Sequence, residues 1–112
     1  MMATRDEAMS LWNERYGDRT EVPDFAGYLM RKGAYNDRNS QYGWNIHHKQ
    51  PLTKGGQDDK LNIELTSIYV NDTIANKTSY VIDDVIYETK RIKKPEYGIY
   101  RKDNGERVDY EY

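Results

Sequence analysis

The spacing of hydrophobic positions is helical in the N-terminal part of the chain and strand-like after it. Ala8, Leu11, Trp12 and Tyr16 recur at helical intervals after Thr4-Arg5-Asp6-Glu7, which fits a capping box, so we expect a helix that Gly17 ends. Pro23 suits the first position of a second helix that Gly33 stops. Residues 33–43 are polar and rich in turn formers. The N-terminal part, residues 1–42, is therefore predicted to be helical.

The middle of the chain changes to strand-like spacing. Residues 44–48 predict a short strand, residues 51–60 a compact polar loop, and residues 62–70, with apolar side chains at alternate positions, a second strand. Asn71-Asp72 is a suitable start for a short helix that runs to about Lys77. The sequence thus predicts a strand–loop–strand–helix unit over residues 43–78.

The C-terminal part, residues 79–112, has β character. Residues 80–82 and 85–87 flank Asp83-Asp84, which predicts a hairpin. Residues 97–102 and 106–112 flank Asp103-Asn104-Gly105, the best local turn signal in the chain. We expect a single α+β domain over residues 1–112, with N-terminal helices and C-terminal antiparallel β-hairpins.

Composition narrows the class of protein. The chain has one Phe but eleven Tyr and two Trp, so its core depends on large amphipathic side chains, and we expect Trp44 and most tyrosines there rather than in base stacking. It has no Cys, which excludes disulfides, thiolate zinc sites and cysteine nucleophiles. No apolar run is long enough to span a bilayer, and the first residues lack a hydrophobic signal region. We expect a cytoplasmic protein with no membrane partner.

Charge is distributed unevenly, although the net charge is only −2. Residues 87–102 hold six cations and two acids, and the cations are Lys90, Arg91, Lys93, Lys94, Arg101 and Lys102. Such a cluster suits phosphate contacts, but it is also what a solvated strand edge looks like. The cluster alone decides nothing about function.

The only two histidines are adjacent, at His47-His48. Neighbours on a strand point to opposite faces, so the two imidazoles suit different tasks: one binding a cation, the other accepting a proton from water. Pro51, Gly55-Gly56, Asn62 and Asn71 follow at set intervals, with 14 residues from His48 to Asn62 and 9 from Asn62 to Asn71.

This segment resembles the HNH endonuclease motif of the ββα-metal, or His-Me finger, superfamily, as found in small bacterial and phage HNH proteins. The resemblance implies a ββα-metal motif over residues 43–78. It makes His48 the general base and Asn62 the residue that pins the loop, with His47 and Asn71 as ligands of a divalent metal ion. Lys77, Lys49 and Lys54 would bind phosphates of DNA, or less favourably RNA.

Two features depart from that pattern. Many relatives have Asp where His47 stands, so the implied site carries no anionic ligand and suits Mn²⁺, Ni²⁺ or Zn²⁺ better than Mg²⁺. Ala75 stands where some zinc-binding members have His.

Asn71 as a simple helix cap remains the competing interpretation. The sequence predicts a metal-dependent DNA endonuclease, with a catalytically inert nucleic-acid- or protein-binding module as the alternative.

Overall fold

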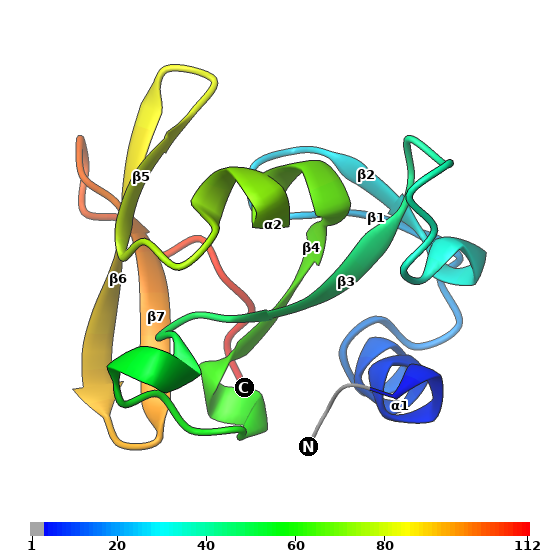
Figure 1. Ribbon diagram of the computed structural model, residues 1–112, viewed down its shortest axis with the longest axis horizontal. Coiled ribbons are helices and arrows are strands. Elements are labelled where there is room, and N and C mark those ends of the chain that lie inside the picture. Colours follow the sequence, from blue (N-terminus) through cyan, green and yellow to red (C-terminus); the bar gives the residue numbers. More distant parts are fainter. Residues whose placement is uncertain (1–3) are drawn as a thin grey trace.

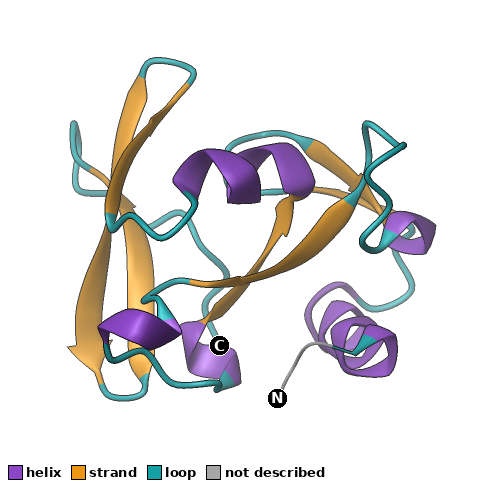
Figure 2. Cartoon of the chain, viewed as in Figure 1, coloured by secondary structure: helices purple, strands orange, loops and turns teal. Residues whose placement is uncertain are grey.

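The computed structural model describes residues 4–112, which form a small α+β domain (Figures 1 and 2). The strand and helix elements run in the order α1 (Arg5–Tyr16), β1 (Glu21–Pro23), β2 (Leu29–Arg31), η1 (Lys32–Ala34), β3 (Trp44–His48), η2 (Leu52–Lys54), η3 (Lys60–Asn62), β4 (Ile63–Ser67), α2 (Ile68–Ile74), β5 (Ser79–Ile82), β6 (Val85–Lys93) and β7 (Glu96–Arg101). The antiparallel sheets pair β1 with β2, β3 with β4, and β5-β6-β7 in that order. The predicted α+β class is confirmed.

Helix α1 forms as the capping box predicts. The Thr4 hydroxyl accepts a hydrogen bond from the Glu7 N–H at 3.2 Å and donates one to the Glu7 carboxylate at 2.8 Å. The apolar face packs on the β3-β4 hairpin, where the Trp12 and Trp44 rings lie 4.9 Å apart. Both rings are fully buried. This contact forms the centre of the first hydrophobic cluster.

The prediction of a second helix after Pro23 is wrong. The segment is the β1-β2 hairpin, with Val22 paired to Met30 and both side chains buried. Gly27 adopts φ +92°, which a helix excludes, and the Asp24 carboxylate accepts hydrogen bonds from the N–H groups of Ala26 and Tyr28. Asp24 therefore directs a turn where the apolar spacing alone suggests a helical face.

The second hydrophobic cluster lies between α2 and the three-stranded sheet. Val70 and Ile74 of α2 pack with Tyr80, Tyr87 and Ile99, and Figure 1 shows the sheet to one side of the β3-β4 hairpin with α2 between them. The β5-β6 hairpin is confirmed, and its turn residues Asp83 and Asp84 have φ of 49° and 67°, as a two-residue type I′ turn requires. Helix α2 thus packs on the three-stranded sheet through this cluster, and it also contacts β3 and β4.

The predicted terminal hairpin forms differently. Strand β7 pairs with β6 along its length, whereas the following segment makes only an isolated bridge between Tyr100 and Arg107. The chain then runs as an extended tail back to the β3-β4 hairpin, where the Tyr110 N–H donates to the Glu64 carboxylate. The C-terminal residues thus support the middle of the chain. Among residues 4–112, no helix has the length and apolar character to cross a membrane.

Candidate functional site

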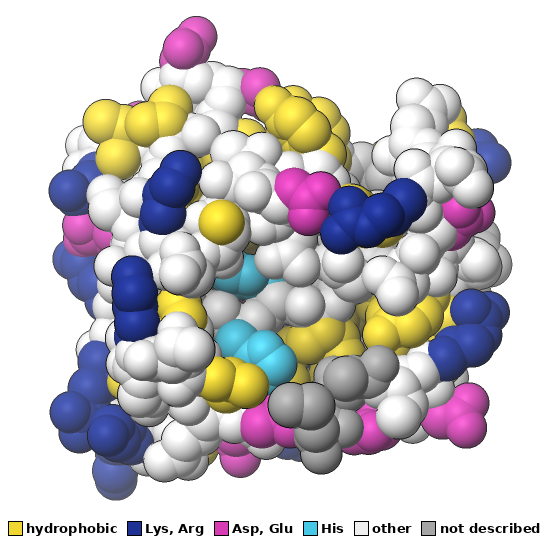
Figure 3. Space-filling model, viewed as in Figure 1, with side chains coloured by type: hydrophobic (Ala, Val, Ile, Leu, Met, Phe, Trp, Pro, Cys, Tyr) yellow, Lys and Arg dark blue, Asp and Glu magenta, His cyan; other side chains and the backbone are white. Residues whose placement is uncertain are grey.

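The two histidines lie at the end of β3, and their side chains diverge as the strand geometry predicts. His47 is buried, with 4% of its surface exposed, and contacts Asn71 on α2. His48 is partly exposed and contacts the loop between η2 and η3. Figure 3 shows both histidine side chains in a depression near the centre of the viewed face. They therefore have separate partners and separate surroundings.

His47 and Asn71 are brought together across 24 residues of sequence. His47 Nδ1 lies 2.9 Å from Asn71 Oδ1, and the Asn71 amide donates to Asn45 Oδ1 at 2.6 Å and to the Ile46 carbonyl at 3.3 Å. The amide donors of Asn71 are thus used within the protein, which aims its oxygen at the imidazole. An amide oxygen only accepts hydrogen bonds, so in this contact His47 Nδ1 carries the proton. Nδ1 and Oδ1 would hold a shared cation in place of that proton, with the ring proton moved to Nε2.

The electrostatics of His47 also suit a metal ligand. Burial lowers the pKa of its imidazole to about 4, against the opposing effect of the Asn71 hydrogen bond, so the ring is neutral at physiological pH. Metal binding requires the neutral ring. His47 Nε2 is buried and has no hydrogen-bond partner among the described residues. The donors present are therefore neutral nitrogen and amide oxygen, which fit Mn²⁺, Ni²⁺ or Zn²⁺.

Asn71 is not the cap of helix α2. Helix α2 begins at Ile68, three residues earlier than predicted, and its N-cap is Ser67, whose hydroxyl accepts a hydrogen bond from the Val70 N–H at 3.1 Å. The carboxylate of Asp24 accepts a hydrogen bond from the Ser67 N–H at 2.9 Å. Asn71 therefore lies inside the helix and directs its side chain toward β3. The cap interpretation of Asn71 is wrong.

Asn62 holds the loop that follows the histidines. Its Oδ1 accepts a hydrogen bond from the Gln50 N–H at 2.9 Å, and its Nδ2 donates to the carbonyls of Gln50 at 3.0 Å and Gln57 at 2.9 Å. Its own carbonyl accepts from the Lys49 N–H, next to His48. Asn62 is completely buried, and these are the hydrogen bonds expected of a residue that pins the loop.

Gly56 completes the same loop by allowing a close approach of two backbones. A Cβ at this position would lie against the Gln50 carbonyl oxygen, at 1.9 Å, and against Asn62 Nδ2, at 2.8 Å. No side chain fits there without moving the loop. The Gly pair of the sequence motif is therefore explained at Gly56 by packing, whereas Gly55 supplies a left-handed residue at φ +89°.

The three predicted phosphate-binding lysines differ in location. Lys54 and Lys77 are exposed, at the end of η2 and just beyond α2. Lys49 is instead buried, with 1% exposure, and its ammonium contacts the Asp109 carboxylate at 2.7 Å. Because Lys49 is enclosed and paired, it does not present its charge to a surface phosphate. Its role is to anchor the C-terminal tail beneath β3.

Sequence reasoning did not find Asp58 or Asn45. Asp58 Oδ1 lies 2.8 Å from His48 Nε2, and Asn45 orients the Asn71 amide. Asp58 lies next to Asp59 in a polar loop, and nothing in the spacing distinguishes the two carboxylates. The alternation of β3 could have indicated Asn45, because it places Asn45 on the same side of the strand as His47.

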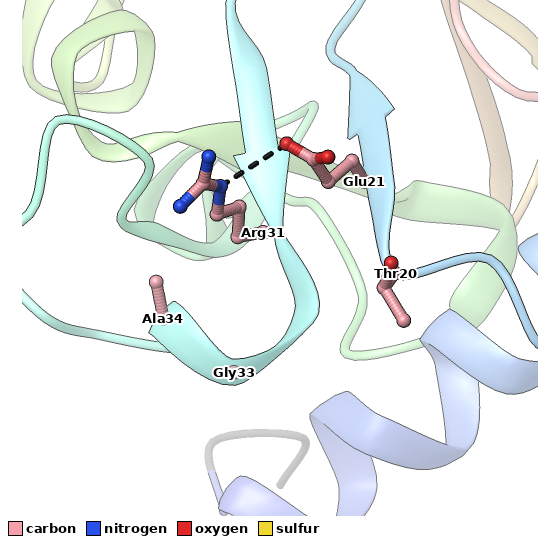
Figure 4. Close-up of a pocket in the computed structure, with 5 residues that line it drawn as sticks. All are labelled: Thr20, Glu21, Arg31, Gly33 and Ala34. Carbon is pink, nitrogen blue, oxygen red and sulfur yellow. Dashed lines mark hydrogen bonds and ion pairs between the residues drawn. The ribbon is translucent and has the colours of Figure 1, made fainter.

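Other hollows lie away from the histidines. One, of about 350 Å³, is lined by Thr20, Glu21, Arg31, Gly33 and Ala34, and within it the Arg31 guanidinium contacts the Glu21 carboxylate at 3.1 Å (Figure 4). That ion pair satisfies the two charged groups of the hollow. Neither this hollow nor a smaller one beside Glu64 includes a histidine.

No protein-family model, curated protein or solved structure matches the chain. The chemistry of the site therefore rests on its own residues: a buried neutral imidazole paired with an amide oxygen, a second imidazole held by a carboxylate, and a loop fixed between them.

Proposed function

We propose that the protein is a metal-dependent endonuclease of the HNH type that hydrolyses phosphodiester bonds in DNA. The observation that carries the proposal is the division of the adjacent histidines between two environments. His47 is buried and paired with Asn71 at 2.9 Å, whereas His48 is partly exposed and held by a loop carboxylate at 2.8 Å. In this proposal the unit formed by β3, β4 and α2 is a ββα-metal motif.

His47 and Asn71 would hold a divalent cation, with Mn²⁺, Ni²⁺ or Zn²⁺ preferred over Mg²⁺. When bound, the cation would neutralise charge on the scissile phosphate and on the leaving 3′ oxygen. His48 would take a proton from water while the water oxygen bonds to phosphorus. The bond from phosphorus to the 3′ oxygen then breaks, and that oxygen takes a proton from solvent. The products are a 5′-phosphate and a 3′-hydroxyl end.

The basic segment supports a DNA partner. Lys90, Arg91, Lys93 and Lys94 are all exposed on β6 and its following turn. Figure 3 shows Lys and Arg side chains along the margin where Figure 1 places the three-stranded sheet, beside the depression that holds the histidines. Lys54 and Lys77 are exposed as well. These charges would contact phosphates away from the site and give affinity without sequence preference.

The test is nicking of supercoiled plasmid in Mg²⁺, Mn²⁺, Ni²⁺ or Zn²⁺, with an EDTA control. We expect cleavage that needs the metal and falls by about 10²- to 10⁴-fold in His48→Ala, the usual contribution of a general base. His48→Gln is the matched variant, because its amide still forms a hydrogen bond but accepts no proton. It should lose activity equally. Cleavage that persists in both variants would refute the role of His48.

The exposed cations of β6 also favour a second function, an inert module that binds nucleic acid through the same surface. Such a module would retard DNA on a gel equally with metal, with EDTA and in His48→Ala, and would cleave nothing. Replacing Lys90 and Arg91 should then lower the salt dependence of DNA binding by about one unit of log–log slope for each phosphate that the protein no longer neutralises. Cleavage and binding in the same preparations separate the two functions.

A further inference from the structure

The contact between His48 and Asp58 is a polar contact at the site that the sequence motif does not account for. His48 Nε2 and Asp58 Oδ1 are 2.8 Å apart, and the two side chains are 21% and 25% exposed. A carboxylate only accepts hydrogen bonds, so in the neutral imidazole this contact requires the proton to be on Nε2. Nδ1 is then the nitrogen that carries the free lone pair.

The loop that carries Asp58 is fixed on both sides. The preceding carbonyl, that of Gln57, accepts a hydrogen bond from Asn62 Nδ2 at 2.9 Å. The following side chain, that of Asp59, accepts one from the Leu61 N–H at 2.9 Å and so caps η3. Asn62 is also bound to the backbone of Gln50, two residues after His48. The buried Asn62 amide therefore holds the backbone next to both His48 and Asp58.

We propose that Asp58 is a positioning residue for His48: its carboxylate fixes the ring orientation and the Nε2–H tautomer, so that Nδ1 faces the reacting water. This inference rests on the proposed nuclease function. In this proposal Asp58 acts through His48 and not directly on substrate or metal. The two neighbouring carboxylates thereby have different tasks, because Asp59 shapes the loop and Asp58 directs the base.

The first test needs neither metal nor substrate. The tautomer of His48 is read from its ¹⁵N shifts and couplings in metal-free protein, at a pH where the same spectrum shows a neutral imidazole. We expect the Nε2–H form in the parent and in Asp58→Glu, and a mixture of tautomers in Asp58→Ala. Asp59→Ala is the matched control, since it removes the adjacent carboxylate but keeps the hydrogen bond from Asn62 to the Gln57 carbonyl that holds the loop. Its His48 tautomer should remain that of the parent.

The second test measures cleavage by the same variants. Loss of an orienting partner typically costs about 10- to 100-fold, so Asp58→Ala should lower kcat by about that factor with little change in KM, and Asp58→Glu should recover part of it. An Asp58→Ala protein with the parent's tautomer and kcat would overturn the inference, as would an Asp59→Ala protein with the same losses. Absence of metal-dependent cleavage in the parent would refute the nuclease, and the tautomer measurement would still decide what Asp58 does.

Discussion

Protonation of His47 should destabilise the folded protein, because its imidazole is buried. Burial lowers the pKa of His47 from its usual 6.5 to about 4 in the folded chain. As the pH falls below 6.5, the unfolded chain takes up this proton and the folded chain does not, so His47 lowers the free energy of unfolding progressively until about pH 4. One pKa unit corresponds to about 1.4 kcal/mol, which limits the total to about 3 kcal/mol and gives about 2 kcal/mol at about pH 5.

A neighbouring group opposes this effect in the parent protein. Burial raises the pKa of Glu64 to about 7, although Arg15 counteracts it. With a raised pKa, Glu64 takes up its proton first in the folded state, so it increases stability as the pH falls from about 7 toward its ordinary 4.5. The parent's own pH profile therefore mixes two contributions of opposite sign. Only a comparison with a variant isolates His47.

His47→Gln is the appropriate variant, because glutamine does not titrate and can still form a hydrogen bond with Asn71. Urea unfolding followed by fluorescence is suitable, since Trp12 and Trp44 are both buried. The loss of stability from about pH 7 to about pH 5, in EDTA, should be about 2 kcal/mol greater in the parent than in His47→Gln. If the two proteins change in parallel over this interval, burial does not hold His47 neutral and the expected pH dependence is refuted.

Two further predictions concern the supports of the site. Gly56→Ala should shift the loop away from Gln50, cost about 1–3 kcal/mol of unfolding free energy and abolish plasmid nicking, whereas Gly33→Ala, where a Cβ meets nothing within 4 Å, should stay within about 0.5 kcal/mol of the parent in the same assays. Lys49→Met should cost about 1–3 kcal/mol in urea unfolding, because the buried Asp109 carboxylate loses its ammonium partner and keeps only Arg107 and the Ile99 N–H. Lys60→Met, which breaks the exposed pair with Glu14, should cost less than about 1 kcal/mol. Equal effects in either pair of variants would contradict the packing and burial on which these predictions depend.

The parts of the fold that sequence predicts well are those fixed by neighbouring residues. The cap of α1, strand β3 and the β5-β6 hairpin depend on local hydrogen bonds and alternation, and all three agree with the sequence pattern. The start of α2 has a local signal too, the Ser67 hydroxyl three residues before Val70, but the apolar alternation that continues to Tyr69 hides it.

The rest depends on contacts between distant residues. The expected second helix does not form, because Asp24 caps a turn and also binds the start of α2, 43 residues later. Lys49 resembles a surface lysine until Asp109 is placed beside it, 60 residues along the chain. For the candidate site, spacing alone identifies His47, His48, Asn62 and Asn71 as a group. Spacing gives no way to distinguish Asp58 from Asp59, because that difference arises only from how the loop folds.

The C-terminal tail packs against β3, and this contact affects the order in which the parts of the protein fold. Asp109 and Tyr110 bind Lys49 and Glu64, and the Tyr112 hydroxyl lies 2.9 Å from Arg15 Nε. During synthesis the histidine hairpin leaves the ribosome well before these partners, so its Lys49 charge is without a buried counter-ion until Asp109 is made. A growing chain would thus contain every residue of the site before the site itself is stable. A stable β3 therefore depends on a residue that lies 60 positions later in the chain than Lys49.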